Sequence, residues 1–159
     1  MAEEIKAICF CNVVTIGNKR YNEAYEKVHN QDSLWAWANV RAIENVLGKI
    51  SCSMVVADQF GDESILQNAL SKKGYQIKLE QRVPSRQDSA IKAASIVARA
   101  ALTQHILQLS QQLNMDLPIG TSDPAIITIG QEIVAKGGQN ALAEVAKLHF
   151  RTTQLILQK

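Results

Sequence analysis

The sequence has few cysteines and no long apolar run, which are features of many secreted and membrane proteins. Its three cysteines, Cys9, Cys11 and Cys52, are an odd number in apolar, strand-like surroundings. We therefore expect buried, reduced thiols and a cytoplasmic chain, not a disulfide framework. Cys9 and Cys11 lack the Cys-x-x-Cys spacing and have no histidine cluster nearby, so we expect no zinc site. No apolar run approaches the roughly 18 residues that cross a bilayer, and the acidic start of the chain does not resemble a signal peptide.

The chain also lacks a strong charge of one sign. Its 17 basic and 15 acidic side chains give a net charge of +2. That charge is too small to identify a partner, so any nucleic-acid argument depends on how the charges are distributed. A length of 159 residues with 47% hydrophobic residues indicates one globular domain over 1–159.

The hydrophobic pattern predicts strands that alternate with helices, which is typical of an α/β domain. Turn signals built from glycine, proline and asparagine separate the segments. We expect strands at 7–16, 53–57 and 75–83, helices at 32–47, 62–73, 88–113 and 122–137, and one or two short helices within 140–157.

Two carboxylates occupy positions at which α/β proteins hold ligands. Asp58 follows the buried strand at 53–57, and ligands gather outside the carboxyl ends of strands. Asp88 begins the long helix at 88–113. Each also has an ordinary explanation, because Asp58 can start a loop and Asp88 can cap a helix. Together they can converge on one divalent cation, although two-metal phosphodiester chemistry usually needs three or four carboxylates.

A basic segment lies between the two carboxylates and continues onto the long helix. Cations spaced in this way can follow a phosphate backbone, but solvated helix and strand faces often show the same spacing. Glu80 is the only acidic residue between 72 and 86. The basic residues are Lys72, Lys73, Lys78, Arg82, Arg86, Lys92 and Arg99.

Three further side chains each allow two interpretations. Trp35 and Trp37 fit a core or an interface better than a platform for stacking bases, because neighbouring positions alternate with helix-core residues. His149 can be catalytic, but a single histidine between Leu148 and Phe150 is more often a packed residue with one satisfied nitrogen.

Five motifs, in the same order along the chain, resemble bacterial ribonuclease HIII, a member of the type 2 ribonuclease H family. They cover nearly the whole chain but correspond only to the latter part of a family member. The motifs are Asn18-Lys19-Arg20-Tyr21-Asn22, Val56-Ala57-Asp58-Gln59-Phe60, Ala93-Ala94-Ser95-Ile96-Val97-Ala98-Arg99, Leu117-Pro118-x-Gly120 and Ala146-Lys147-Leu148-His149-Phe150.

The resemblance implies a ribonuclease H-like fold, here a truncated mixed sheet flanked by helices with a helical C-terminal part. It also implies metal-dependent cleavage of the RNA strand in RNA·DNA hybrids. By the same resemblance, Asp58 and Asp88 are the third and fourth metal-binding carboxylates, with Mg²⁺ or Mn²⁺ as the cofactor. The basic segment and the helix that carries Ser95 are then expected to lie near the hybrid, which is recognised through 2′-hydroxyls and phosphates.

The chain departs from the family pattern at the catalytic centre. It contains no Asp-Glu-x-Gly motif, which supplies the family's first two carboxylates, and no counterpart of the N-terminal substrate-binding domain. The family's His-Asn pair after Trp37 reads Asn39-Val40. We therefore expect the isolated chain to be a poor nuclease or none. Absent middle strands leave open sheet edges, which a homodimer or a strand-donating partner is expected to cover. The alternative is a structural or interaction protein that keeps only the fold.

Overall fold

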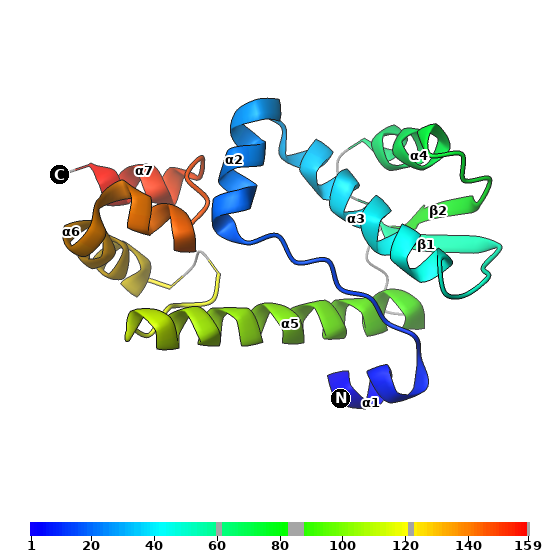
Figure 1. Ribbon diagram of the computed structural model, residues 1–159, viewed down its shortest axis with the longest axis horizontal. Coiled ribbons are helices and arrows are strands. Elements are labelled where there is room, and N and C mark those ends of the chain that lie inside the picture. Colours follow the sequence, from blue (N-terminus) through cyan, green and yellow to red (C-terminus); the bar gives the residue numbers. More distant parts are fainter. Residues whose placement is uncertain (60–61, 83–87, 121–122, 159) are drawn as a thin grey trace. The chain divides into compact units, whose positions relative to one another are not determined.

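The computed structural model describes residues 1–59, 62–82, 88–120 and 123–158, and these form two compact units (Figure 1). The first unit comprises Met1–Val14 and His29–Ala101, and the second comprises Thr15–Val28 and Leu102–Lys159. Helix α5 (Ser89–Leu113) contributes residues to both. A single domain over 1–159 stays a prediction.

The first unit is built on two parallel strands, β1 (Met54–Asp58) and β2 (Lys78–Arg82), paired from Met54 opposite Lys78 to Asp58 opposite Arg82. Helix α1 (Ala2–Ile8) belongs to the same unit. Helices α3 (Gln31–Leu47) and α4 (Glu63–Lys72) pack on each other. Their core is made of the buried side chains of Val40, Leu66 and Leu70, with Ala57 of β1 and Leu79 of β2 packed against it.

The connection from β1 through α4 to β2 explains why the strands are parallel. Asp62 begins α4 by accepting a hydrogen bond from the Ser64 backbone N–H at 2.8 Å. Gly74 follows the helix with φ of 81°, a conformation that glycine adopts without steric cost. A strand, a crossover helix and a second parallel strand bring the carboxyl ends of both strands to the same edge of the sheet. Asp58 and Arg82 are therefore neighbours.

The second unit is helical. It contains α2 (Asn18–Val28), the later part of α5, α6 (Ala125–Val145) and α7 (Arg151–Leu157). Its core consists of Ile133 and Leu142 from α6 together with Ile156 from α7. Within α6 the direction changes at Gly138, whose φ of 68° interrupts the helical geometry. The predicted α/β class and the helical C-terminal part are confirmed.

The strand predicted at 7–16 is wrong. Ala7 and Ile8 end helix α1, and residues 9–17 are neither helix nor strand. Apart from bonds at the helix ends, no backbone hydrogen bond within the described residues joins this segment to another part of the chain. β-branched residues form a strand only beside a pairing partner. The thiols of Cys9, in this segment, and of Cys52, before β1, are exposed, where buried thiols were expected; all three cysteines are free.

Other helices and strands of the structure also differ from the predicted ones. Helix α3 begins at Gln31, one residue before the predicted start at 32, and Asn30 caps it, because its side-chain oxygen accepts from the Ser33 backbone N–H at 2.9 Å. Helix α2 was not predicted, since Gly17 and Asn18 resemble a turn. The sheet predicted as mixed consists of two parallel strands in the described part of the chain.

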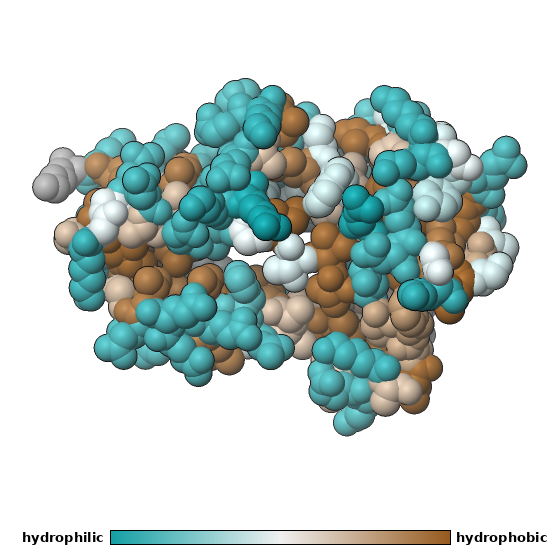
Figure 2. All heavy atoms as spheres, viewed as in Figure 1, coloured by the Kyte–Doolittle hydropathy of each residue, from teal (hydrophilic) through white to brown (hydrophobic). Residues whose placement is uncertain are grey.

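Many hydrophobic side chains are exposed in the described structure, and Figure 2 shows several at the surface. In the first unit these include Ile8 at 83% exposed, Trp37 at 53% and Phe10 at 49%. Singly exposed apolar residues are normal, but so many large ones suit a surface that another segment covers. No helix in the described ranges is long and apolar enough to span a membrane.

Substitution of Gly130 tests the packing of the second unit. A Cβ atom at this position would meet Cδ1 of Ile156 and would lie 2.8 Å from its Cγ1. Overpacking typically costs about 1–3 kcal/mol, more than the ~1 kcal/mol that alanine gains over glycine in a helix. We expect Gly130→Ala to destabilise the chain in urea unfolding followed by circular dichroism.

Gly17→Ala is the matched control, because no atom lies within 4 Å of its Cβ position. We expect its unfolding free energy to change by no more than about 0.5 kcal/mol. Equal stability of Gly130→Ala and the unchanged chain would contradict the observed contact between α6 and α7.

Candidate metal and nucleic-acid site

Asp58 is the last residue of β1, and one oxygen of its carboxylate is buried without a hydrogen-bond donor among the described residues. Its position in the sheet is fixed by pairing with Arg82, and the Gln59 backbone N–H donates to the Arg82 carbonyl at 2.9 Å. The Oδ1 atom of Asp58 is buried and accepts no hydrogen bond from the described residues. A buried carboxylate oxygen without a donor is costly, so the position suits a ligand that supplies positive charge or a proton.

Asp88 stands immediately before α5 and both of its oxygens are engaged. Oδ1 accepts hydrogen bonds from the backbone N–H groups of Ala90 at 3.0 Å and Ile91 at 3.1 Å. Oδ2 accepts from Nη1 of Arg82 at 2.8 Å. The Asp88 side chain is only 12% exposed. Asp88 therefore acts as the helix cap that its position allowed.

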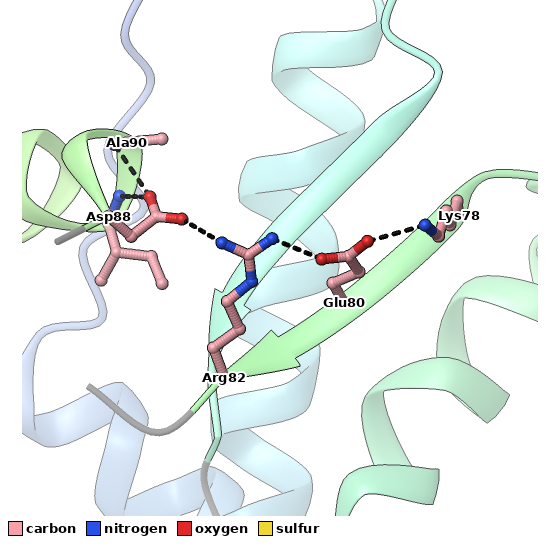
Figure 3. Close-up of polar contacts among 6 residues, drawn as sticks. Lys78, Glu80, Arg82, Asp88 and Ala90 are labelled. Carbon is pink, nitrogen blue, oxygen red and sulfur yellow. Dashed lines mark hydrogen bonds and ion pairs between the residues drawn. The ribbon is translucent and has the colours of Figure 1, made fainter. Parts of the chain in front are cut away.

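A chain of ion pairs runs along β2, from Lys78 at its start through Glu80 and Arg82 to Asp88 (Figure 3). Nζ of Lys78 lies 2.7 Å from Oε1 of Glu80, and Arg82 bridges Oε2 of Glu80 to Asp88. Hydrogen bonds from Lys78 and then Arg82 lower the Glu80 pKa to about 2. The hydrogen bond to Glu80 is the main reason that the Arg82 pKa is raised.

The role of Glu80 was missed in the sequence, although a signal was present. Residues two apart on a strand lie on the same face, so Lys78, Glu80 and Arg82 form a row of alternating charge. From the sequence alone, Glu80 is simply the acidic residue within a basic segment. In the structure Glu80 pairs with two cations of that segment, Lys78 and Arg82.

Arg82 draws the two predicted carboxylates to one edge of the sheet. It is the strand partner of Asp58 and it hydrogen-bonds to Asp88. The carboxylates do not, however, form a complete site for a divalent cation. No group of three or more histidine, cysteine, aspartate or glutamate residues suited to a metal occurs in the described ranges. Oδ1 of Asp58 accepts no hydrogen bond from the described residues, whereas both oxygens of Asp88 accept them.

The predicted basic residues fall into two sets. Nζ of Lys73 lies 3.1 Å from Glu44, so Lys73, like Lys78 and Arg82, is paired with a carboxylate. Lys72 is exposed at the end of α4. Arg86 lies outside the described residues.

The second set lies on one exposed face of α5. Lys92, Ser95 and Arg99 follow Asp88 at spacings of four, three and four residues and are all exposed. Such positions stack on one side of a helix. Neither Lys92 nor Arg99 forms an ion pair within the part of the chain that the structure describes. Their charges are therefore available to an anionic ligand.

The remaining candidates are placed differently. Trp35 and Trp37 are 43% and 53% exposed on α3, so they do not belong to a core and fit the interface interpretation. The His149 ring stacks on Tyr25 with centroids 3.8 Å apart and contacts Phe150 edge to face. His149 is thus the packed residue that the sequence allowed.

Comparison with known proteins identifies the relationship. No protein-family profile matches the chain. A curated ribonuclease HIII of Protochlamydia amoebophila is 36% identical over 159 residues, covering 100% of this chain and 52% of that protein. The ribonuclease HIII of Chlamydia caviae is 36% identical over 154 residues, covering 96% and 51%. The chain is ribonuclease HIII-like along its whole length. It spans about half the length of the curated relatives it matches.

Solved structures support the ribonuclease HIII-like fold. A glutamine-to-alanine mutant of Bst-RNase HIII superposes with a TM-score of 0.80 at 23% identity, over 91% of this chain and 48% of that one. Bst-RNase HIII in complex with Mn²⁺ gives 0.79 at 22% identity, with the same coverage. The second structure shows that a ribonuclease HIII binds Mn²⁺.

Removal of the Arg82 charge tests whether Asp88 is withheld from metal ions. We expect Arg82→Met to strengthen Mn²⁺ binding, measured by calorimetric titration, by at least about fivefold. The repulsion between two unit positive charges about 4 Å apart is about 1 kcal/mol even in water, and the substitution removes the Arg82 charge.

Lys78→Met is the control, because it removes a cation of the same strand that contacts Glu80 but not Asp88. We expect it to change Mn²⁺ affinity less than Arg82→Met. Equal affinities of Arg82→Met and the unchanged chain would show that the ion pair does not limit metal binding.

Proposed function

We propose that this chain binds RNA·DNA hybrids and that it cleaves their RNA strand only when further carboxylates complete its site. The observation that carries the proposal is the meeting of Asp58, Arg82 and Asp88 at one edge of the sheet. Asp88 also begins the face of α5 that presents free cations. The ribonuclease HIII likeness along the whole chain supports a nucleic acid as the ligand.

Binding depends on the exposed face of α5. Lys92 and Arg99 lie two helical turns apart and have no carboxylate partner among the described residues. They can contact successive phosphates of one strand, and the Ser95 hydroxyl between them can hydrogen-bond to a phosphate or a 2′-hydroxyl. Contacts of this kind select a nucleic-acid shape and not a base sequence.

Cleavage is limited by the ligand set. Mg²⁺ and Mn²⁺ prefer oxygen ligands, and two-metal phosphodiester cleavage uses several carboxylates. The 159 residues contain no Asp-Glu-x-Gly motif, and Asp88 is held by Arg82. The isolated chain is therefore a binder with little or no nuclease activity, and Asp58, whose Oδ1 has no donor among the described residues, is its proposed metal ligand.

A binding and cleavage assay on one labelled RNA·DNA hybrid tests the proposed function. In metal-free buffer we expect binding whose affinity falls with salt, and we expect Arg99→Gln to reduce the slope of log affinity against log salt by about one. Lys136→Gln, whose lysine pairs with Glu132 at 2.7 Å, is the control and should leave the slope unchanged. With Mg²⁺ or Mn²⁺ we expect little cleavage.

Two outcomes of this assay would contradict the proposal. The absence of hybrid binding at low salt would leave only a ribonuclease H-like fold, in agreement with a structural or interaction protein. Strong cleavage that survives Asp58→Asn would mean that the chain cleaves by a route that does not use the sheet-edge carboxylates.

The residues after α1 supply the surface through which the site is completed. Phe10 and Val13 are 49% and 39% exposed, and their segment makes no strand pairing in the described chain. An unpaired, β-branched segment is a template for an added strand. A second copy of this chain is the partner that is always present, and symmetric dimers are the commonest assemblies.

Light scattering coupled to gel filtration tests self-association. We expect a dimer, and we expect Val13→Lys to shift the mass toward the monomer because a charge is placed in the added-strand interface. Ile119→Lys, which introduces the same charge at a side chain 54% exposed in the other unit, should leave the dimer intact. A monomer at every concentration would favour a different, strand-donating chain.

A further inference from the structure

A short loop in the second unit is held by buried polar side chains. Residues 146–150 connect α6 to α7. Asn22 of α2 is 8% exposed, and its Nδ2 donates to the carbonyls of Ala143 at 3.0 Å and Ala146 at 2.9 Å. Its Oδ1 accepts from the Leu148 backbone N–H at 2.9 Å. One buried amide thus fixes the backbone on both sides of Lys147.

The carbonyl of Lys147 is fixed as well. Thr153, 3% exposed in α7, donates its hydroxyl to the Lys147 carbonyl at 2.9 Å. Buried hydrogen bonds of this kind keep the backbone in one arrangement, because losing one leaves an unsatisfied polar group. Lys147 therefore projects from a backbone that is preorganised and not from a freely moving loop.

The Lys147 ammonium lies over aromatic rings and lacks a carboxylate. Its Nζ is 4.3 Å from the centroid of the Tyr21 ring and 5.4 Å from that of Phe150. The ammonium forms no ion pair or hydrogen bond with any of the described residues. Glu144, the acidic residue nearest in sequence, is paired with Lys19 at 3.1 Å.

The Lys147 ammonium is partly buried, and no carboxylate of the described residues offsets its charge. Burial lowers the Lys147 pKa, so the charged form is less favourable here than in water. Burial, and then the charge of Lys147, lower the pKa of the neighbouring His149. An anion at the ammonium would relieve both effects, since an opposite charge favours the cation.

We propose that Lys147 is a phosphate-binding residue of the second unit, and that its ligand is a backbone phosphate of the bound nucleic acid. The inference rests on the proposed function for the identity of the ligand, while the fixed loop and the unpaired ammonium are independent of it. A lysine ammonium binds phosphate as a point charge, and the rings of Tyr21 and Phe150 hold it in place without neutralising it.

Hybrid binding by three variants of the full chain tests this proposal. Lys147→Gln removes the charge, Lys147→Arg keeps it, and Lys136→Gln removes an exposed charge of the same unit that is already paired with Glu132. In metal-free buffer, we expect Lys147→Gln to reduce the slope of log affinity against log salt by about one. Lys147→Arg should restore the slope, and Lys136→Gln should not change it.

Nuclear magnetic resonance of the Lys147 side chain in the unchanged protein keeps the test valid if Lys147→Gln unfolds. We expect the Lys147 signals to shift, and its pKa to rise, when the hybrid is added. Inorganic phosphate is titrated in a separate arm. A response to inorganic phosphate without any response to the hybrid would overturn the assignment to nucleic acid and would identify a site for free phosphate.

The failure of this inference can be told apart from failure of the proposed function. If the hybrid binds with the same salt slope in Lys147→Gln and the unchanged chain, Lys147 contacts no phosphate and only the inference is overturned. If the unchanged chain binds no hybrid, both are overturned. A Lys147 that responds only to an acidic peptide would mark a protein interface and would also overturn the assignment.

Discussion

The candidate site depends on the parallel pairing of β1 with β2. Because α4 connects them as a crossover helix, the two strands end at the same edge of the sheet, with Asp58 opposite Arg82. The guanidinium of Arg82 then reaches Asp88 at the start of α5. A carboxylate that follows one strand and a carboxylate that precedes a later helix thus meet at one edge through a single cation. Without this pairing the two acids are unrelated positions in the sequence.

The same cation limits what the edge can do. Arg82 pairs with both Glu80 and Asp88, so the Asp88 carboxylate is already paired with a cation of the protein itself. One buried oxygen of Asp58 at this edge has no hydrogen-bond donor among the described residues. The free positive charge lies beyond the edge, along α5 at Lys92 and Arg99. The unpaired cations on α5 and the paired charges at the edge are therefore separate features of the first unit.

Sequence reasoning succeeded where local chemistry decides the structure. The helix that Asp88 opens and the strand that ends at Asp58 are both present, because capping and a short β-branched run are local signals. The strand predicted at 7–16 was wrong. This segment has the composition of a strand, but it has no pairing partner in the described chain. A β-branched run forms a strand only where a second segment pairs with it, and the residues of 7–16 do not show whether such a partner exists. The pairing of Glu80 with Lys78 and Arg82 was also missed. Counting basic residues along the segment does not show which of them share a strand face with Glu80.

The central claim is that Asp58 and Asp88 share one metal-accessible edge of the sheet. Paramagnetic broadening by Mn²⁺ in a ¹⁵N spectrum of the chain measures this directly, since broadening depends on distance to the bound ion. The account predicts that signals of Ala57, Asp58 and Arg82 at the strand ends, and of 88–91 at the start of α5, broaden first, and that Asp58→Asn abolishes the effect. Broadening that begins elsewhere, or that persists in Asp58→Asn, would contradict it.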